Sequence, residues 1–232
     1  MAQTHDHGDG DHSHPAAPMV EEISDFEILE IAVRELAIEK GLFSPEDHRR
    51  FMEWAQRIGP HGGSRLVARA WLDPEFKQRL LSDGTETSKE IGIDWLDPTG
   101  TGTPSDYTYF YVIENTPTVH NVIVCTLCSC YPRPVLGQAP EWYKTPHYRR
   151  RVVRWPREVL AEFGLHLPAN VEVRVHDSNQ KSRFMVLPMR PEGTDGWTED
   201  QLAAIVTRDT MIGVALPRAD WTADRSPAAT PR

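Results

Sequence analysis

The sequence has few cysteines, no long apolar run and no excess of basic residues. Among 232 residues, 25 are lysine or arginine and 34 are aspartate or glutamate, so the formal net charge is −9. This charge argues against general nucleic-acid binding. No apolar run approaches the roughly 20 residues of a membrane helix, and the N-terminus has no apolar signal core. Three cysteines cannot all pair in a secreted framework, so we expect a cytoplasmic protein that contacts neither nucleic acid nor membrane.

The chain divides into four segments of different composition. Residues 1–20 are rich in His, Asp, Gly and Pro, so we expect a disordered tail there. Residues 21–97 predict a helical arm, and residues 98–216 predict a layered α/β domain because strand patterns join the helical ones. Residues 217–232 predict a second, loose tail. The expected fold class is therefore α+β.

The first tail contains four of the chain's ten histidines, which are His5, His7, His12 and His14. Together with nearby aspartates they could capture transition metals weakly. We favour a plain solvated tail, because flexible His/Asp tracts bind metals without being built to do so.

Helix start and stop signals recur along the chain. Ser24 and Glu27 have capping-box spacing before an apolar stripe that Gly41 ends. Further helix starts are predicted at Pro45, at Asp73-Pro74, at Pro156 and at the Thr198/Gln201 capping box. The wide apolar faces of the first helices indicate either an arm that clasps a partner or packing within the chain.

Strand patterns occupy the second half of the chain. Aromatic and β-branched residues predict strands at 107–113 and 119–124, with a turn at 115–117 between them. Alternating residues at 171–175 and an apolar run at 184–187 flank a second turn at 177–180. These two segments predict a β-hairpin.

All three cysteines lie within six consecutive residues, at Cys125, Cys128 and Cys130. The C-x-x-C and C-x-C spacings share Cys128, so three sulfurs must meet in a small volume, which indicates a metal site. Zinc would require a fourth ligand, for which His120 is the nearest candidate. A low-spin trivalent ion could instead use the peptide nitrogens of Ser129 and Cys130, leaving one position open for catalysis.

Two other interpretations of these cysteines involve no metal. One is a redox-active C-x-x-C pair, and the other is a set of buried free thiols. The redox motif normally begins a helix, and Pro132 and Pro134 argue against a helix at this point. A metal site is therefore the favoured interpretation.

A basic segment follows the cysteines and contrasts with the acidic chain. Its cations are Lys144, Arg149, Arg150, Arg151, Arg154 and Arg157. Such a segment is typical of an arginine-rich interface or of an electropositive approach for an anion. A solvated basic face is the alternative.

The cysteine motif resembles the metal-binding loop C-(S/T)-L-C-S-C of the nitrile hydratase alpha-subunit family. The resemblance covers residues 21–216 and includes Glu114–Pro117, His120–Val122, Pro134–Gly137, Trp142–Lys144, Val186–Pro188, Gly193-Thr194, Val206–Asp209 and Met211–Gly213. It implies the family fold, a non-corrin metal centre and a site built between subunits of a hetero-oligomer. A dedicated activator that loads the metal is also implied.

The resemblance further implies a role for each residue of the loop. Cys125 would remain a thiolate, Cys128 would become a sulfinate and Cys130 a sulfenate, which are the lower steps of cysteine oxidation. The backbone nitrogens of Ser129 and Cys130 would complete the ligand plane. Thr126 resembles the cobalt branch of the family, whereas the iron branch usually has serine there, so Co(III) is the expected ion.

One position departs from the usual nitrile hydratase pattern. Those enzymes read C-Y-P-W-P after the second C-x-C cysteine, whereas this chain has Arg133 in place of the tryptophan. A small anion such as thiocyanate would gain a charge-assisted contact worth roughly 1.5–3 kcal/mol. In this respect, and in Met19–Glu22 and the His/Asp-rich start, the chain resembles the thiocyanate hydrolase gamma subunits, a branch of the family. An ordinary structural ion pair is the alternative role of Arg133.

This branch implies hydrolysis of thiocyanate to carbonyl sulfide and ammonia, with alpha and beta subunits as partners. Arg133 would bind the anion, and the Cys130 sulfenate oxygen or hydroxide would attack its carbon. One alternative is the alpha subunit of a cobalt nitrile hydratase, which converts nitriles to amides. Another is a non-catalytic metal-binding or assembly subunit that contains zinc.

Overall fold

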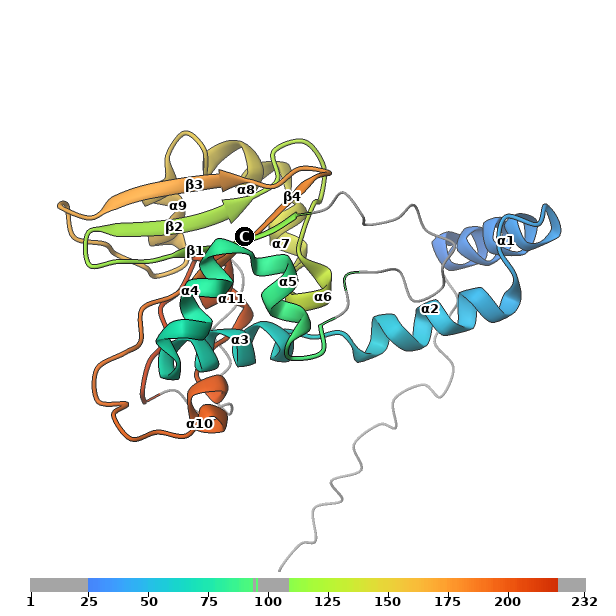
Figure 1. The fold of residues 1–232 in the computed structure, drawn as a ribbon. Helices are drawn as coiled ribbons and strands as arrows, with labels where there is room; N and C mark the ends of the chain where they lie inside the picture. The colour runs from blue at the N-terminus through green and yellow to red at the C-terminus, as the bar shows by residue number, and fades with distance from the viewer. Residues whose placement is uncertain (1–24, 94, 96–108, 221–232) are drawn as a thin grey trace, which may run out of the picture. The chain divides into compact units, whose positions relative to one another are not determined.

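The computed structural model describes residues 25–93, 95 and 109–220 (Figure 1). The chain forms two compact units, Met1–Pro45 and Glu46–Arg232. The predicted tail at 1–20, the predicted boundary between residues 97 and 98, and residues 221–232 lie outside the described residues. Among the described residues, no helix has both the length and the apolar character needed to cross a bilayer.

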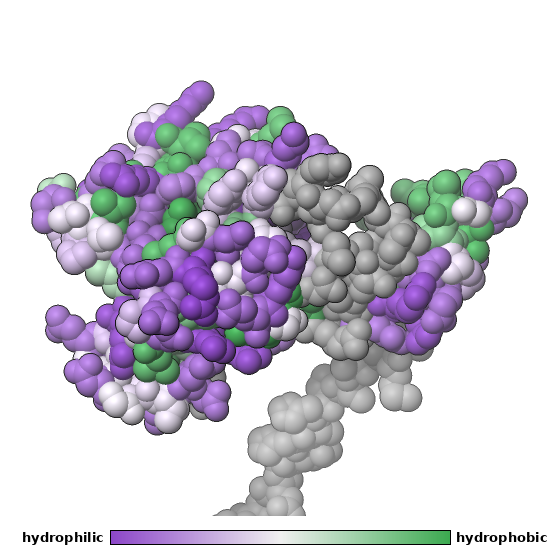
Figure 2. Space-filling view, in the orientation of Figure 1, coloured by the Kyte–Doolittle hydropathy of each residue, from purple (hydrophilic) through white to green (hydrophobic). Residues whose placement is uncertain are grey.

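The first unit contains helix α1 (Asp25–Glu39). It begins where the capping pattern predicts, although Ser24 itself lies outside the described residues, and Gly41 follows its end with a φ of 69°. None of its side chains is buried. Large apolar residues, including Phe26 at 84% exposure, give α1 an apolar surface (Figure 2).

The second unit begins with helices that follow the predicted start signals. They are α2 (Pro45–Arg57), α3 (His61–Leu72), α4 (Pro74–Ser82) and α5 (Gly84–Lys89). Asp73 caps α4 by accepting hydrogen bonds from the backbone N–H groups of Glu75 and Phe76, as its position before Pro74 predicts. Leu66, Phe76 and Leu80 on α3 and α4 are fully buried. Helices α4 and α5 pack beside β1 (Tyr109–Glu114), so this region belongs to the core of the second unit.

Four strands carry the centre of the second unit, in two parallel pairs (Figure 1). Strand β1 pairs with β4 (Ser182–Leu187), and β2 (Val119–Val124) pairs with β3 (Glu172–Asp177). The predicted hairpin of residues 171–175 with 184–187 is therefore wrong. The turn exists, because the Asn179 side chain accepts from the N–H groups of Lys181 and Ser182. However, β3 before the turn and β4 after it each pair with a strand far away in the sequence.

The connection from β2 to β3 contains the cysteines and four short helices. These are α6 (Arg133–Leu136), α7 (Glu141–Lys144), α8 (Pro146–Arg151) and α9 (Pro156–Glu162). Helix α9 begins at the predicted Pro156 and is followed by Gly164 with a φ of 80°. The mixture of helices and strands confirms the predicted α+β class.

The chain returns to β2 through α10 (Glu199–Ala204) and α11 (Arg208–Ile212). The predicted capping box of Thr198 and Gln201 is present at α10. Gly213 ends α11 with a φ of 95°, and its α-carbon lies against the backbone of Asn121 on β2. A side chain at this position would collide with that backbone, so only glycine allows the close approach.

Candidate metal centre

The cysteine loop, residues 125–130, connects a buried strand to a short helix. Val122, Ile123 and Val124 of β2 are fully buried, and so is Cys125. After the loop, Val135 and Leu136 of α6 are fully buried as well. Both ends of the loop are thus held by the core, which is how a rigid scaffold positions a functional loop. The loop itself is not helical, as Pro132 and Pro134 predict.

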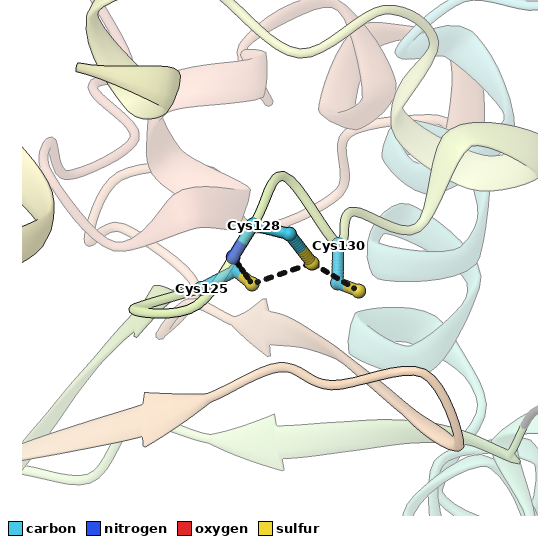
Figure 3. A group of neighbouring side chains, drawn as sticks. All are labelled: Cys125, Cys128 and Cys130. Atoms are coloured by element: carbon cyan, nitrogen blue, oxygen red, sulfur yellow. Dashed lines mark hydrogen bonds between the residues drawn. The ribbon is translucent and has the colours of Figure 1, made fainter. Parts of the chain in front are cut away.

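The three sulfurs meet, as the spacing predicts (Figure 3). The Sγ atom of Cys128 lies 3.5 Å from that of Cys125 and 3.2 Å from that of Cys130. All three atoms lie within 4.8 Å of one another, and the Cys128 N–H donates to Cys125 Sγ at 3.2 Å. Within the described part of the chain, no other group of three or more potential metal-binding side chains lies so close together. This soft donor set fits a transition metal.

His120 does not join the sulfurs. It is buried in β2, where its Nε2–H donates to the Gly213 carbonyl at 2.7 Å and its Nδ1 accepts from Asn115 Nδ2 at 3.2 Å. Both ring nitrogens are therefore engaged, and the pattern fixes the Nε2–H tautomer. The zinc hypothesis with His120 as fourth ligand is not supported by this geometry.

The buried His120 gives stability a pH dependence. Burial lowers its pKa from the usual 6.5, despite the bond to Gly213. Below pH 6.5 the unfolded chain therefore binds more protons than the folded chain does. The contribution of His120 to the free energy of unfolding is complete above that pH and falls as acid is added. His176, whose pKa burial also lowers, acts in the same direction. Urea denaturation at a series of pH values measures the free energy of unfolding. This energy should depend less on pH in His120→Gln than in the wild type, whereas the control variant His166→Gln should keep the wild-type dependence. An unchanged pH dependence in His120→Gln would contradict the assignment to His120.

The pKa values of the Cys128 and Cys130 thiols are shifted in opposite directions. Contact with the Cys130 thiol lowers the pKa of Cys128, assisted by Cys125 and by backbone N–H groups of Cys130 and Ser129. Burial raises the pKa of Cys130 to about 12, and the adjacent Cys128 adds to this, while Arg183 opposes it. Negative charge therefore gathers first on Cys128. The backbone nitrogens of Ser129 and Cys130 as metal donors remain a prediction.

The ends of the loop are less exposed than its middle. Cys125 is buried, Cys130 is half-buried and Cys128 is exposed, as is Ser129. Leu127 stands at 86% exposure beside them. The sulfur cluster thus has a buried base and an open face.

Arg133 is exposed and occupies the first position of α6, three residues after Cys130. Its backbone N–H donates to the Tyr131 carbonyl at 2.8 Å. Its side chain makes no hydrogen bond or ion pair with the described residues that would hold it in a structural role. A binding role for Arg133 remains a prediction.

Three side chains far away in sequence hold the loop, and sequence reasoning did not identify their role. Asp177, at the end of β3, accepts from the N–H of Thr126 at 2.9 Å and from its hydroxyl at 2.5 Å. Tyr143 donates to the Cys130 carbonyl at 3.1 Å, and Arg149 donates to the Cys128 carbonyl at 2.5 Å. These partners could not be found from local patterns, because the signal lies in long-range pairing.

The basic segment 144–157 separates into residues with different contacts. Lys144 pairs with Glu141, Arg151 pairs with Glu162, and Arg157 donates to the carbonyls of Leu167, Pro168 and Val171. Arg149 alone among these cations binds the cysteine loop in the described structure. Arg150 and Arg154 are exposed. Much of the segment therefore supports the fold instead of forming a uniform basic face.

The Asp177 bonds predict a measurable effect on metal retention. Asp177→Ala removes both acceptors for Thr126 and should release the start of the loop. Because the site is exposed, we expect a moderate effect, about tenfold faster loss of metal to a chelator. Asp177→Asn keeps one acceptor oxygen, so its rate of metal loss should lie between those of the wild type and Asp177→Ala. Equal rates for Asp177→Ala and the wild type would contradict a role in holding the loop.

Known proteins are similar to this chain over most of its length. The family model for the alpha chain of nitrile hydratase matches residues 24–215. The chain is 66% identical over 204 residues to thiocyanate hydrolase subunit gamma of Thiobacillus thioparus, covering 87% of this chain and 84% of that protein. It is 50% identical over 185 residues to a cobalt-containing nitrile hydratase subunit alpha of Pseudonocardia thermophila, with coverages of 79% and 86%.

Solved structures agree with the fold. A recombinant thiocyanate hydrolase with partially modified cobalt centres has a TM-score of 0.84 at 61% identity and covers 91% of this chain and 98% of its own. A thiocyanate hydrolase variant with an arginine replaced by tryptophan has a TM-score of 0.82 at 61% identity, with coverages of 91% and 99%. The expected alpha-subunit-like fold is thereby confirmed. Sequence, fold and cysteine loop together place this chain in the nitrile hydratase alpha-chain family.

Proposed function

We propose that this chain is the cobalt-bearing catalytic subunit of a thiocyanate hydrolase. The observation that carries the proposal is a three-sulfur cluster, followed by the exposed Arg133, in a chain 66% identical to a thiocyanate hydrolase gamma subunit. The overall reaction is SCN⁻ + 2 H₂O → COS + NH₃ + OH⁻. The family relationship supports an enzyme that acts on a carbon–nitrogen triple bond.

The cysteine loop would hold the metal. Cys125, Cys128 and Cys130 would supply three sulfurs, and the backbone nitrogens of Ser129 and Cys130 would supply two more donors, as the family resemblance implies. This set of strong-field donors suits Co(III) and leaves room for a substrate. A cobalt ion bound there supplies Lewis acidity towards the nitrile nitrogen of thiocyanate.

The other steps belong to side chains of this protein. Arg133 attracts thiocyanate by its positive charge and orients it over the open face of the loop. Before turnover, an external oxidant such as dioxygen would oxidise Cys128 to a sulfinate and Cys130 to a sulfenate. The sulfenate oxygen is the proposed nucleophile at the thiocyanate carbon, and water would restore that oxygen when the product leaves. Cys125 is buried and is therefore the sulfur least accessible to an oxidant.

The functional enzyme would contain other subunits. The relatives are themselves described as subunits gamma and alpha. The open face of the cysteine loop and the exposed apolar residues of α1 are the surfaces that we assign to alpha and beta partner chains. A separate activator would load the cobalt.

The test is an assay of the co-expressed, cobalt-loaded complex. Headspace measurement of carbonyl sulfide should show release from thiocyanate, and mass spectrometry of the peptide spanning residues 125–130 should show oxygen on Cys128 and Cys130. Unmodified thiols in active enzyme would rule out the sulfenate mechanism. Hydration of small nitriles without thiocyanate turnover would instead support the second candidate, a cobalt nitrile hydratase alpha subunit, which the 50% identity to such a protein favours.

A further inference from the structure

Arg149 contacts the cysteine loop at one particular peptide bond. Its Nη1 donates to the carbonyl oxygen of Cys128 at 2.5 Å, across 21 positions of sequence. Helix α8 fixes the side chain, because the adjacent Tyr148 is buried and donates to the Ile123 carbonyl at 2.7 Å. The guanidinium is thus held against the loop by the same core that holds β2.

The carbonyl that Arg149 binds shares its peptide group with the nitrogen of Ser129. Oxygen, carbon and nitrogen of a peptide are conjugated, so charge placed on the nitrogen spreads to the oxygen. When this nitrogen binds a metal, the N–H bond breaks, the proton passes to solvent and a nitrogen–metal bond forms. The negative charge left behind appears in part on the Cys128 carbonyl oxygen, which Arg149 faces.

We propose that Arg149 is a positioning residue that stabilises the negatively charged Cys128–Ser129 peptide in the metal-loaded loop. This inference rests on the proposed metal centre. Arg149 would thus act on a peptide bond of the cysteine loop, whereas the proposed role of Arg133 is to bind the substrate.

Two features favour this role over a simple structural hydrogen bond. The Arg149 guanidinium has no carboxylate partner among the described residues, and its buried Nε has no hydrogen-bond partner there. A neutral carbonyl is a weak partner for such a charge, and leaving a buried donor unpaired is costly. A peptide that carries negative charge would strengthen the bond that Nη1 already makes, because hydrogen bonds between two ionised groups are the stronger kind.

The experiment compares three variants of the cobalt-loaded complex. Arg149→Gln keeps a hydrogen-bond donor and removes the charge, Arg149→Lys keeps the charge, and Arg79→Gln is the control, since that arginine binds Glu90 instead. The measurements are the rate of cobalt loss to a chelator, the number of nitrogen ligands by X-ray absorption, and the thermal stability of the metal-free complex.

We expect Arg149→Gln to lose cobalt about tenfold or more faster than the wild type, with fewer nitrogen ligands. Arg149→Lys should retain the nitrogen ligands, and Arg79→Gln should match the wild type. Unchanged cobalt loss and ligation in Arg149→Gln would overturn the proposal. Equal loss in the Gln and Lys variants, in step with equal destabilisation of the metal-free complex, would also overturn it, because the bond would then only support the loop.

Failure of the proposed function gives a different result. A wild-type complex with nitrogen-ligated cobalt but no carbonyl sulfide release would overturn the thiocyanate assignment and leave the role of Arg149 intact. Cobalt bound by sulfur alone, in an enzyme that does release carbonyl sulfide, would overturn only the role of Arg149.

Discussion

Replacing Arg133 by tryptophan should lower kcat/KM for thiocyanate by about ten- to a hundredfold. The charge-assisted contact between a guanidinium and a small anion contributes roughly 1.5–3 kcal/mol, and the indole cannot replace it. Most of the loss should appear in KM, because Arg133 is exposed and its proposed role is to bind an anion that arrives from solvent. Carbonyl sulfide release at a series of thiocyanate concentrations measures both constants.

Two further variants control this result. Arg133→Lys keeps the charge without the planar guanidinium and should lose less than the tryptophan form. Arg218→Trp introduces the same ring at an exposed arginine that pairs with Asp220, and should leave thiocyanate turnover unchanged. If Arg133→Trp hydrolyses thiocyanate as well as the wild type does, Arg133 is not the substrate-binding cation. A gain in nitrile hydration by Arg133→Trp would show that pocket charge selects the substrate.

Removing a sulfur from the cysteine loop should have the largest effect of all. Cys130→Ser replaces a soft donor by a hydroxyl that binds cobalt poorly, and it removes the proposed nucleophile. Residues that only support a metal ligand cost about 10–100-fold when lost, so a ligand itself should cost more than that in both cobalt content and turnover. Metal analysis and the carbonyl sulfide assay measure the two losses separately.

All three cysteines of the chain lie in the loop, so no cysteine elsewhere can provide a control variant. The serine variants of the three cysteines are therefore compared with one another. Cys125→Ser places a hydroxyl in a fully buried position and should also lower stability, whereas Cys128→Ser, at an exposed position, should not. Full cobalt content together with full activity in Cys130→Ser would contradict its assignment as ligand and nucleophile.

Local signals predicted much of this fold. Asp73 before Pro74 and the Thr198/Gln201 pair mark helix starts, because capping bonds form between residues only a few positions apart. The convergence of the three sulfurs could be predicted for the same reason, because the cysteines lie within six consecutive residues. The pairing of β3 with β2, and of β4 with β1, could not be predicted, because a turn fixes the direction of the chain and not the choice of a distant partner strand.

The same distinction applies to the site. Cys125, Cys128 and Cys130 are visible in the sequence, and Arg133 stands out against a family pattern. The supports Arg149 and Asp177 are not visible, since each reaches the loop from a separate element. In the sequence, Arg149 is only one cation of a basic segment, and the members of that segment make different contacts in the structure.

The partnership of Thr126 with Asp177 also orders events during synthesis. The two residues lie 51 positions apart, which corresponds to roughly 3–10 s of translation at about 5–20 residues per second. The three thiols therefore emerge from the ribosome this long before the carboxylate that holds Thr126, and before strand β3 is complete. A correctly shaped cobalt site therefore becomes available only late, after the second parallel pair has formed, and non-local pairing of this kind is slow. Newly made chains thus pass through a period in which the three thiols are present before Asp177 holds the start of the loop.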